Sequence, residues 1–298
     1  MNTFEYHPTT SVAEALELLN HYGDDVHLIA GGTSMVLLMQ QGLLQPAHVV
    51  GLRGISALYG IERTPERGLN IHSCTTHRDI ERSTDVRAYC PALVDTFSQI
   101  ATIRIRNQAT LGGNLVHADP AQDPPPMLLA LGARVVVVGS SGERTVLLDE
   151  FFVDYFETAL RDGEILTSIQ LPPLPAGSRA TSVKFLPRTQ DDYATVSVAA
   201  WLNLGPDDRC EDVRVALGAA ASIPMRARLV EDALRGERLT PNVVREVAAL
   251  VRDEVDPLDD VRGSASYKRE MARVWTERAL LRLLSDTPAF AEKQCSLK

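Results

Sequence analysis

The sequence predicts an α+β protein built from two domains. Its 298 residues, 45% of them hydrophobic, are enough for two separate cores. In the middle of the chain, strand-like segments follow one another across short turns, which favours antiparallel pairing. The stretch 171–182 is rich in Pro, Gly and Ser, lacks an apolar period and is the best linker. Beyond it, three strand-like segments and amphipathic helices predict a small α+β domain with a three-stranded antiparallel sheet.

Charge and cysteine usage exclude several classes of function. The formal net charge is −9, from 30 Lys+Arg against 39 Asp+Glu, and no basic block could neutralise a run of phosphates, so we expect no nucleic acid partner. The N-terminus lacks a targeting pattern and no apolar run approaches the ~18 residues of a membrane span, so we expect a cytoplasmic protein without membrane insertion. The cysteines are scattered singly, which predicts no zinc knuckle, iron-sulfur cluster or disulfide framework; they are Cys74, Cys90, Cys210 and Cys295.

The first elements form a helix, a strand and a second helix. Ser11 and Glu14 have capping-box spacing before a helix over 12–22. A short apolar strand over 26–30 runs directly into Gly31 and Gly32, after which Thr33 or Ser34 is expected to cap the next helix. Two glycines at a helix start leave backbone N–H groups open to a phosphate, although an ordinary strand-to-helix turn has the same pattern.

The middle of the chain predicts further strands and helices. A strand ends near Cys74, Thr75 or Thr76 then caps a helix, and another helix follows over 91–101. The alternation of Ile with Arg in "IRIRNQA" at 103–109 suggests an extended segment. A hairpin over 133–148 and a strand over 164–172 complete this region.

Between these elements, "TLGGNLVHADPAQDPPP" at 110–126 holds too many glycines and prolines for a helix or strand and predicts a rigid polar loop. Its Gly112 and Gly113 would form a second turn that exposes the backbone, and two such turns suit a diphosphate better than one. Thr110 and Asn114 can hydrogen-bond locally. The carboxylates of Asp119 and Asp123 suit ribose or ribityl hydroxyls, and the prolines would hold them on a stiff ledge.

Four segments together resemble one protein family: "AGGTS" (30–34), "IRNQATLGGNLVHADPAQDPPP" (105–126), "DGEILTSIQLP" (162–172) and "KFLPRTQDDYATVSVAA" (184–200). The family is the FAD-binding medium subunit of molybdenum hydroxylases, which includes the carbon monoxide dehydrogenase flavoprotein and the flavin domain of xanthine dehydrogenase. The resemblance implies a PCMH-like FAD-binding domain at 1–175, with subdomains of about 1–55 and 56–175. A C-terminal α+β domain of the carbon monoxide dehydrogenase flavoprotein type would occupy 176–298.

The resemblance also implies a non-covalent FAD whose diphosphate lies between the two glycine turns. Asp123 would bind FAD hydroxyls, Leu166 would pack near the isoalloxazine, and Lys184 would support the flavin. Asp191 or Asp192 would lie near the ring edge. The flavin would carry the redox chemistry, so no catalytic residue and no metal ligand is predicted. The predicted cofactor-binding residues are Leu28, Ile29, Ala30, Gly31, Gly32, Thr33, Ser34, Met35, Ile100, Thr110, Leu111, Gly112, Gly113, Asn114, Asp119, Asp123, Leu166, Lys184, Asp191, Asp192 and Tyr193.

Several assignments keep an alternative. Tyr193 would stack on or cover the flavin, but ordinary domain packing would also explain it. Asp191 and Asp192 could form a solvated turn, and His117 could fix local geometry or act as a base. Arg104, Arg106 and Arg188 could pair with carboxylates inside the fold or face a partner subunit. Thr33 departs from the family, which often has His, Asn or Asp there, but its hydroxyl could still cap the helix and meet a phosphate oxygen.

The implied function is that of an oxidoreductase subunit which accepts electrons from an iron-sulfur subunit and passes them to an external acceptor. Molybdopterin and iron-sulfur clusters are expected only in a large and a small partner subunit, together forming a dimer of heterotrimers. One alternative is a free-standing FAD-dependent oxidoreductase acting on a small molecule. A nicotinamide-dependent dehydrogenase is disfavoured because no G-x-G-x-x-G pattern follows the first strand. A binding module that has lost its cofactor would require both glycine turns to be vestigial.

Overall fold

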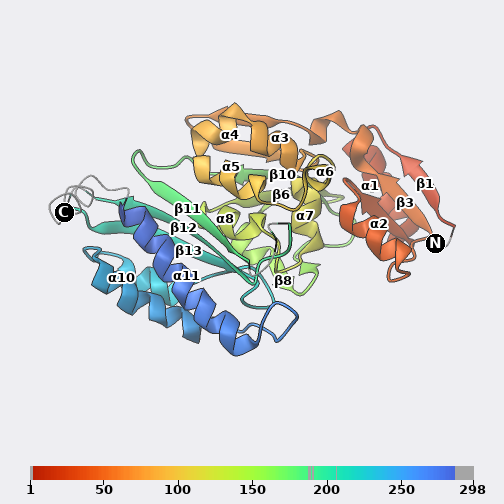
Figure 1. The fold of residues 1–298 in the computed structure, drawn as a ribbon. Coiled ribbons are helices and arrows are strands. Elements are labelled where there is room, and N and C mark those ends of the chain that lie inside the picture. Colours follow the sequence, from red (N-terminus) through yellow and green to blue (C-terminus); the bar gives the residue numbers. More distant parts are fainter. Residues whose placement is uncertain (1–2, 187–188, 190, 206, 286–298) are drawn as a thin grey trace. The chain divides into compact units, whose positions relative to one another are not determined.

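A computed structural model of the chain describes residues 3–186, 189, 191–205 and 207–285 (Figure 1). It divides into two compact units that interleave along the sequence. The first comprises Met1–Tyr89, Ile100–Ala118 and Gly132–Pro173, and the second comprises Cys90–Gln99, Asp119–Leu131 and Leu174–Lys298. Each unit has its own sheets and core.

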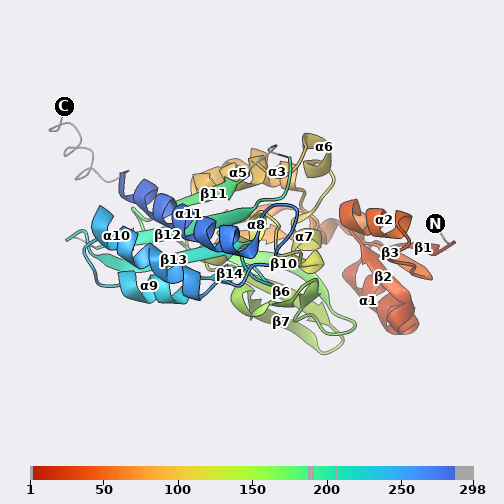
Figure 2. The same cartoon turned by 60° about the horizontal axis from the view of Figure 1, so that its bottom comes forward.

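The N-terminal part of the first unit is a three-stranded parallel sheet with the order β1-β3-β2. Ser11 caps the first helix as predicted, because its side chain accepts a hydrogen bond from the Glu14 N–H. Right-handed crossovers that run in opposite directions along a sheet place their helices on opposite faces, and Figure 2 shows α1 and α2 in this arrangement. The elements are β1 (Glu5–Pro8), α1 (Val12–Tyr22), β2 (Val26–Ile29), α2 (Thr33–Gln40) and β3 (His48–Gly51).

The rest of the first unit is built on a five-stranded antiparallel sheet with the order β4-β5-β10-β6-β7. This confirms the antiparallel pairing predicted from the short turns. Of the two proposed caps, Thr76 is the one used, since its side chain accepts from the Asp79 N–H. The elements are β4 (Ile61–Thr64), β5 (Gly68–His72), α3 (His77–Arg82), α4 (Thr84–Tyr89), α6 (Ile103–Arg106), α7 (Leu111–His117), β6 (Arg134–Gly139), β7 (Gly142–Leu147), β8 (Phe152–Asp154), β9 (Glu157–Thr158) and β10 (Ile165–Leu171).

The extended segment predicted over 103–109 is wrong, because Ile103–Arg106 form the short helix α6. Thr102 begins this helix by accepting a hydrogen bond from the Ile105 N–H. The Arg106 guanidinium donates to the carbonyls of Ile100 and Ala101, which closes the turn. Both isoleucines are substantially exposed, at 49% and 39%, so their alternation with arginine does not mark the buried face of a strand.

The rigid loop predicted over 110–126 is also wrong. Two helices occupy most of it: α7, which contains both glycines, and α8 (Pro124–Ala130). Thr110 caps α7, and Ala118 ends it in the left-handed region with φ 51°. Pro124, Pro125 and Pro126 fill the first turn of α8, where a residue needs no N–H partner within the helix. The prolines therefore start a helix instead of preventing one.

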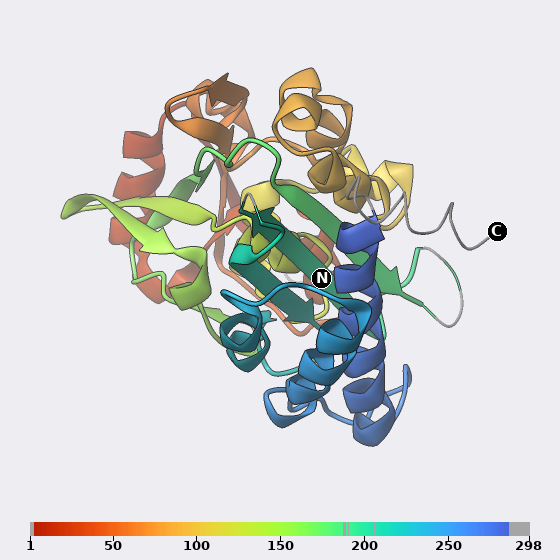
Figure 3. The same ribbon diagram turned by 90° about the vertical axis from the view of Figure 1, so that its left-hand side faces the viewer.

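The second unit contains the sheet β11-β12-β13-β14, which is antiparallel throughout. The three predicted strands are present, and a short fourth strand pairs with β13. Helices α9 to α11 cover one face, as the blue helices show in Figure 3, while α5 and α8 pack on the same sheet. The elements are α5 (Pro91–Ser98), α8, β11 (Arg179–Phe185), β12 (Val196–Leu204), β13 (Cys210–Gly218), β14 (Met225–Arg226), α9 (Arg228–Leu234), α10 (Pro241–Ala248) and α11 (Ala265–Ser285).

Strand β12 is buried along Val196–Leu202 because both of its faces are covered. Val196, Val198 and Ala200 belong to the core formed with α11. The intervening residue Ser197 lines a cavity near α5 and α8. The predicted linker 171–182 is partly structured, since β11 begins at Arg179. Within the described residues, no helix combines the length and the apolar character needed to cross a membrane.

Candidate functional site

The first glycine turn opens α2 without a side-chain cap. Gly32 occupies the N-cap position in the left-handed region with φ 74°, and Thr33 is already the first helical residue. The expectation that Thr33 or Ser34 caps the helix is therefore wrong, because a glycine can adopt the backbone conformation that begins the helix earlier. The first N–H groups of any helix lack intrahelical acceptors, and here no cap side chain satisfies them. An anionic group could bind at this position.

The structure brings this turn against the segment before α7. A Cβ atom added to Gly31 would lie 2.2 Å from the Gln108 carbonyl oxygen and 3.0 Å from the Ala109 Cα. Likewise, a Cβ atom added to Gly113, in the second glycine segment, would lie 3.9 Å from the Cβ of Ala30, which precedes the first glycine turn. The two glycine segments, about eighty residues apart in the sequence, are thus in contact, as a shared diphosphate site requires.

The second glycine segment, with Gly112 and Gly113, does not expose its backbone N–H groups as expected. The N–H groups of Leu111 and Gly112 donate to the carbonyls of Thr75 and Ser73, at 3.0 and 2.7 Å. The Gly113 N–H donates to the Thr110 hydroxyl. These groups hold α7 against the turn between β5 and α3, so this second glycine segment does not expose its N–H groups. It offers a side chain instead, since the Asn114 Oδ1 is buried without a hydrogen-bond partner in the described chain.

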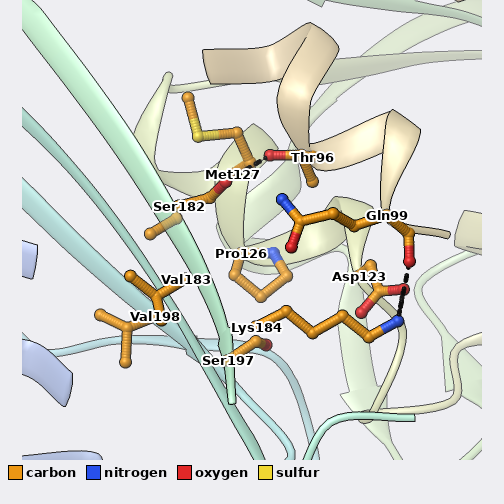
Figure 4. A pocket seen from close by; sticks show the side chains of 11 residues that line it. Thr96, Gln99, Asp123, Pro126, Met127, Ser182, Val183, Lys184, Ser197 and Val198 are labelled. Atoms are coloured by element: carbon orange, nitrogen blue, oxygen red, sulfur yellow. Dashed lines mark hydrogen bonds and ion pairs between the residues drawn. The ribbon is translucent and has the colours of Figure 1, made fainter. Parts of the chain in front are cut away.

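In the second unit, Asp123 and Lys184 line a pocket together with residues of α5, α8, β11 and β12 (Figure 4). The Lys184 Nζ lies 2.8 Å from the Asp123 Oδ2, and it also donates to the Gln99 carbonyl at 2.9 Å. Both side chains are at least 90% buried, with exposures of 6% and 9%. The ammonium group therefore fixes one oxygen of the carboxylate. The other oxygen, Oδ1, has no partner within the described residues.

Burial dominates the electrostatics of this pair. It raises the pKa of Asp123 to about 6, and the nearby Lys184 ammonium opposes this shift only in part. The unpartnered Oδ1 is consequently a buried acceptor that a ligand hydroxyl could satisfy. The Ser197 hydroxyl of the same cavity also lacks a partner in the described chain.

The remaining predicted residues of the second unit surround Tyr193 or lie on the surface. The Asp119 Oδ1 accepts a hydrogen bond from the Ala121 N–H at 2.9 Å, a local turn contact. Tyr193 is 46% exposed, and partial burial together with the carboxylates of Asp119 and Asp123 raises the pKa of its hydroxyl. Asp191 and Asp192 are exposed, and the neighbouring Arg188 and Gln190 lie outside the described residues.

Arg262 is a residue of this region that the sequence analysis misses. Its guanidinium lies 5.8 Å from the centroid of the Tyr193 ring, within cation-π distance. The same guanidinium is held by the Asp260 carboxylate, with the shorter nitrogen-oxygen distance at 2.7 Å. No local pattern marks Arg262, because the contact depends on two loops separated by about seventy residues.

In the first unit, Ile100 and Leu166 are buried, with exposures of 7% and 5%. Leu166 sits at a bulge of β10, where the pairing with β6 shifts register. Arg106 forms an ion pair with Glu81 at 3.0 Å, which assigns it to internal pairing. His117 ends α7, and its ring centroid lies 5.3 Å from that of Phe156.

The site residues are consistent with FAD as a ligand. The uncapped start of α2 suits a diphosphate, and the Asn114 Oδ1 and Asp123 Oδ1 are buried acceptors that ligand donors could satisfy. By contrast, Cys74, Cys90 and Cys210 are free, buried and far apart in sequence, so the described chain offers no cysteine cluster for iron and sulfur.

Two family models together cover most of the chain. One, described as the FAD binding domain in molybdopterin dehydrogenase, matches residues 2–174. The other, described as the CO dehydrogenase flavoprotein C-terminal domain, matches residues 181–283. Both domains are thus of types found in molybdenum-containing dehydrogenases.

Relatives of known name match over nearly their full length. The chain is 33% identical to the carbon monoxide dehydrogenase medium chain of Hydrogenophaga pseudoflava over 277 residues, covering 93% of this chain and 96% of that one. It is 32% identical to subunit alpha of the 6-hydroxypseudooxynicotine dehydrogenase complex of Paenarthrobacter nicotinovorans, with 95% of each chain covered. A solved structure of carbon monoxide dehydrogenase from Hydrogenophaga pseudoflava, lacking the Mo-pyranopterin moiety, matches with a TM-score of 0.92 and 33% identity, covering 95% of this chain and 98% of that chain.

In complexes of the carbon monoxide dehydrogenase type, the molybdenum-pterin and iron-sulfur centres belong to other subunits, which agrees with the lack of a cysteine cluster in the described residues. The chain therefore belongs to the FAD-binding medium subunits of the molybdenum hydroxylases, a family of oxidoreductase subunits.

Proposed function

We propose that this chain binds FAD non-covalently and acts as the electron-transfer subunit of a molybdenum-dependent hydroxylase or dehydrogenase. It would accept electrons from an iron-sulfur subunit and pass them to an external acceptor. The observation that carries the proposal is the contact between the glycine turn at the uncapped start of α2 and the segment 108–113, which leads into α7 and includes its glycines. This arrangement supports a diphosphate site, and a dinucleotide cofactor is the kind of ligand that needs one.

Individual residues would hold the cofactor by different means. The segment Leu28–Met35, with the uncapped N–H groups at the start of α2, would bind the diphosphate, and the buried Asn114 Oδ1 would accept a hydrogen bond from a donor group of the cofactor. Asp123 would accept a hydrogen bond from an FAD hydroxyl through the oxygen that Lys184 leaves open, and Asp119 would accept one from another hydroxyl. Ile100 and Leu166 would supply apolar surface near the flavin.

When bound, FAD supplies the exchange between one-electron and two-electron transfer. Tyr193 would cover the flavin, with Arg262 holding the tyrosine ring in place, and Asp191 or Asp192 would lie near the edge of the flavin ring. Lys184 would fix the carboxylate of Asp123 and add positive charge close to an anionic cofactor.

The assembly follows from the same family relationship. A large molybdenum-pterin subunit and a small iron-sulfur subunit would be the partners, arranged as a dimer of heterotrimers. The names of relatives as medium chains and complex subunits support this proposal.

The domain boundaries are also part of the proposal. Residues 1–175 would form the FAD-binding domain, with subdomains of about 1–55 and 56–175, and residues 176–298 would form the C-terminal domain. The extents of the two family matches support these boundaries.

Two measurements test the proposal. Flavin absorption bands in the purified chain, with FAD released on denaturation, would support the cofactor assignment, and a colourless chain that ignores added FAD would overturn it. Co-purification with two further subunits, one containing molybdenum and one containing iron and sulfur, would support the electron-transfer role. A flavin-loaded chain that purifies alone and turns over a small molecule would instead identify a free-standing oxidoreductase.

A further inference from the structure

Strands β1 and β3 bring together two histidines and a glutamate that belong to no part of the proposed FAD site. The His7 Nε2 and the His48 Nδ1 lie 3.1 Å apart, and the Glu5 Oε2 lies 3.6 Å from the same His48 nitrogen. One ligand atom from each residue falls within 4.8 Å of the others. Imidazole nitrogens and a carboxylate oxygen are the donor set that Zn²⁺ accepts.

The sheet itself creates this cluster. Glu5 pairs with His48 in the parallel register of β1 and β3, and His7 lies two residues further along β1. Residues two apart on a strand share one face, so all three side chains project from the same side of the sheet. They lie where the strands begin, whereas Gly31 and Gly32 follow the other end of β2. The cluster is thus separated from the first glycine turn by the length of a strand.

The rings are held in position by the helix above them. The Tyr22 ring at the end of α1 stacks on His48, with centroids 3.7 Å apart and planes at 22°. It also lies 5.1 Å from the His7 ring. His48 is partly buried, with 21% of its side chain exposed, while Glu5 is 65% exposed and gives access to solvent. A partly buried pair of imidazoles next to an exposed carboxylate allows an ion to enter from water.

The separations agree with ligands of a common ion. With zinc-nitrogen and zinc-oxygen bonds of about 2.0–2.1 Å in tetrahedral geometry, neighbouring ligand atoms lie roughly 3.3 Å apart. The observed separations of 3.1 and 3.6 Å lie on either side of that value. We propose that Glu5, His7 and His48 form a binding site for a divalent metal ion of the zinc class, with water completing the coordination. The ion would tie the N-terminal strand to the centre of its sheet.

Zinc titration of the full-length chain tests this site without reference to flavin or activity. After treatment with a chelator, calorimetric titration with Zn²⁺ should show one ion bound per chain. Glu5→Gln should weaken the affinity roughly tenfold or more, because even changes outside the ligand shell cost 10–100-fold. Since Glu5 is mostly exposed, this variant keeps the fold, and His48→Gln provides a second test.

His21→Gln is the matched control, because His21 contacts the same Tyr22 ring but lies outside the cluster. It should bind Zn²⁺ like the wild type. Absence of stoichiometric binding would overturn the proposal. Equal weakening by His21→Gln and Glu5→Gln would also overturn it, since that result indicates scattered surface binding. The unfolding temperature supplies an independent readout, because an ion that binds only the folded state should raise it in the wild type and much less in Glu5→Gln.

Discussion

Burial destabilises the charged form of the Asp123 carboxyl more than Lys184 stabilises it, and the net result raises its pKa to about 6. Below about pH 3, well under the ordinary value of 3.8, the group is protonated in both the folded and the unfolded chain, and its contribution to stability is constant. As the pH rises from about 4 to 6, the unfolded chain releases this proton first, so the folded state loses stability. The loss is complete above the folded pKa.

Between pH 5 and 7.5, this single group should lower the free energy of unfolding by roughly 1 kcal/mol. Asp123→Asn removes the titrating group and should flatten that part of the pH dependence, as measured by denaturant unfolding of the purified chain at several pH values. Asp119→Asn, in the same segment, serves as the control and should keep the wild-type slope. An unchanged slope in Asp123→Asn would contradict the assignment of a raised pKa to this carboxyl.

At the scale of elements, threonine caps set where the short helices of the first unit begin. Thr76 starts α3 and Thr110 starts α7, and each hydroxyl accepts an N–H three residues later, at 3.1 and 3.2 Å. The two threonines also face each other in an isolated β-bridge. The two caps share this N–H contact and are neighbours in space, although the Thr76 hydroxyl also donates to the Asp79 carboxylate, and only α7 carries the glycines and Asn114.

Thr76→Ala and Thr110→Ala should each lower the free energy of unfolding by about 1 kcal/mol, the usual effect of removing a cap. Only Thr110→Ala should also raise the Kd for FAD, because it loosens the helix start that holds Asn114 in place. Fluorescence titration with FAD and thermal unfolding measure the two effects separately. An equal loss of FAD affinity in Thr76→Ala would show that the effect is one of general stability.

The errors of sequence interpretation at this scale have a common physical cause. In 103–109, alternating Ile and Arg gave the period of a strand, but the capping hydroxyl of Thr102 and the internal contacts of Arg106 stabilise a helical turn. In 110–126, proline and glycine suggested a loop, although proline is compatible with the first turn of a helix. Capping residues outside the apolar pattern determine whether such short helices form. The cap at Ser11 could be predicted from the sequence because a full amphipathic helix follows it.

At the scale of the whole molecule, the sequence predicted the α+β class and the antiparallel middle, because strand period and turn residues are local. It could not predict that Cys90–Gln99 and Asp119–Leu131 pack with the C-terminal half of the chain. The pairing of Asp123 with Lys184 and the place of Arg262 beside Tyr193 follow from that packing. The motifs pointed to Asp123 and Lys184 through resemblance, while Arg262 and the cluster of Glu5, His7 and His48 needed the three-dimensional structure.

A chain with a net charge of −9 must bind an anionic diphosphate through local features, since its overall field repels one. The uncapped start of α2 supplies such a feature, so the diphosphate should contribute much of the affinity for FAD. If FAD binds only the folded chain, a concentration of about 100 times its Kd should stabilise that state by about 2.7 kcal/mol and raise the unfolding temperature accordingly. Riboflavin, which lacks the diphosphate, should give a much smaller increase at the same concentration, as scanning calorimetry can measure. Equal stabilisation by riboflavin and FAD would contradict a diphosphate site at the glycine turns and would place the binding energy at the ring.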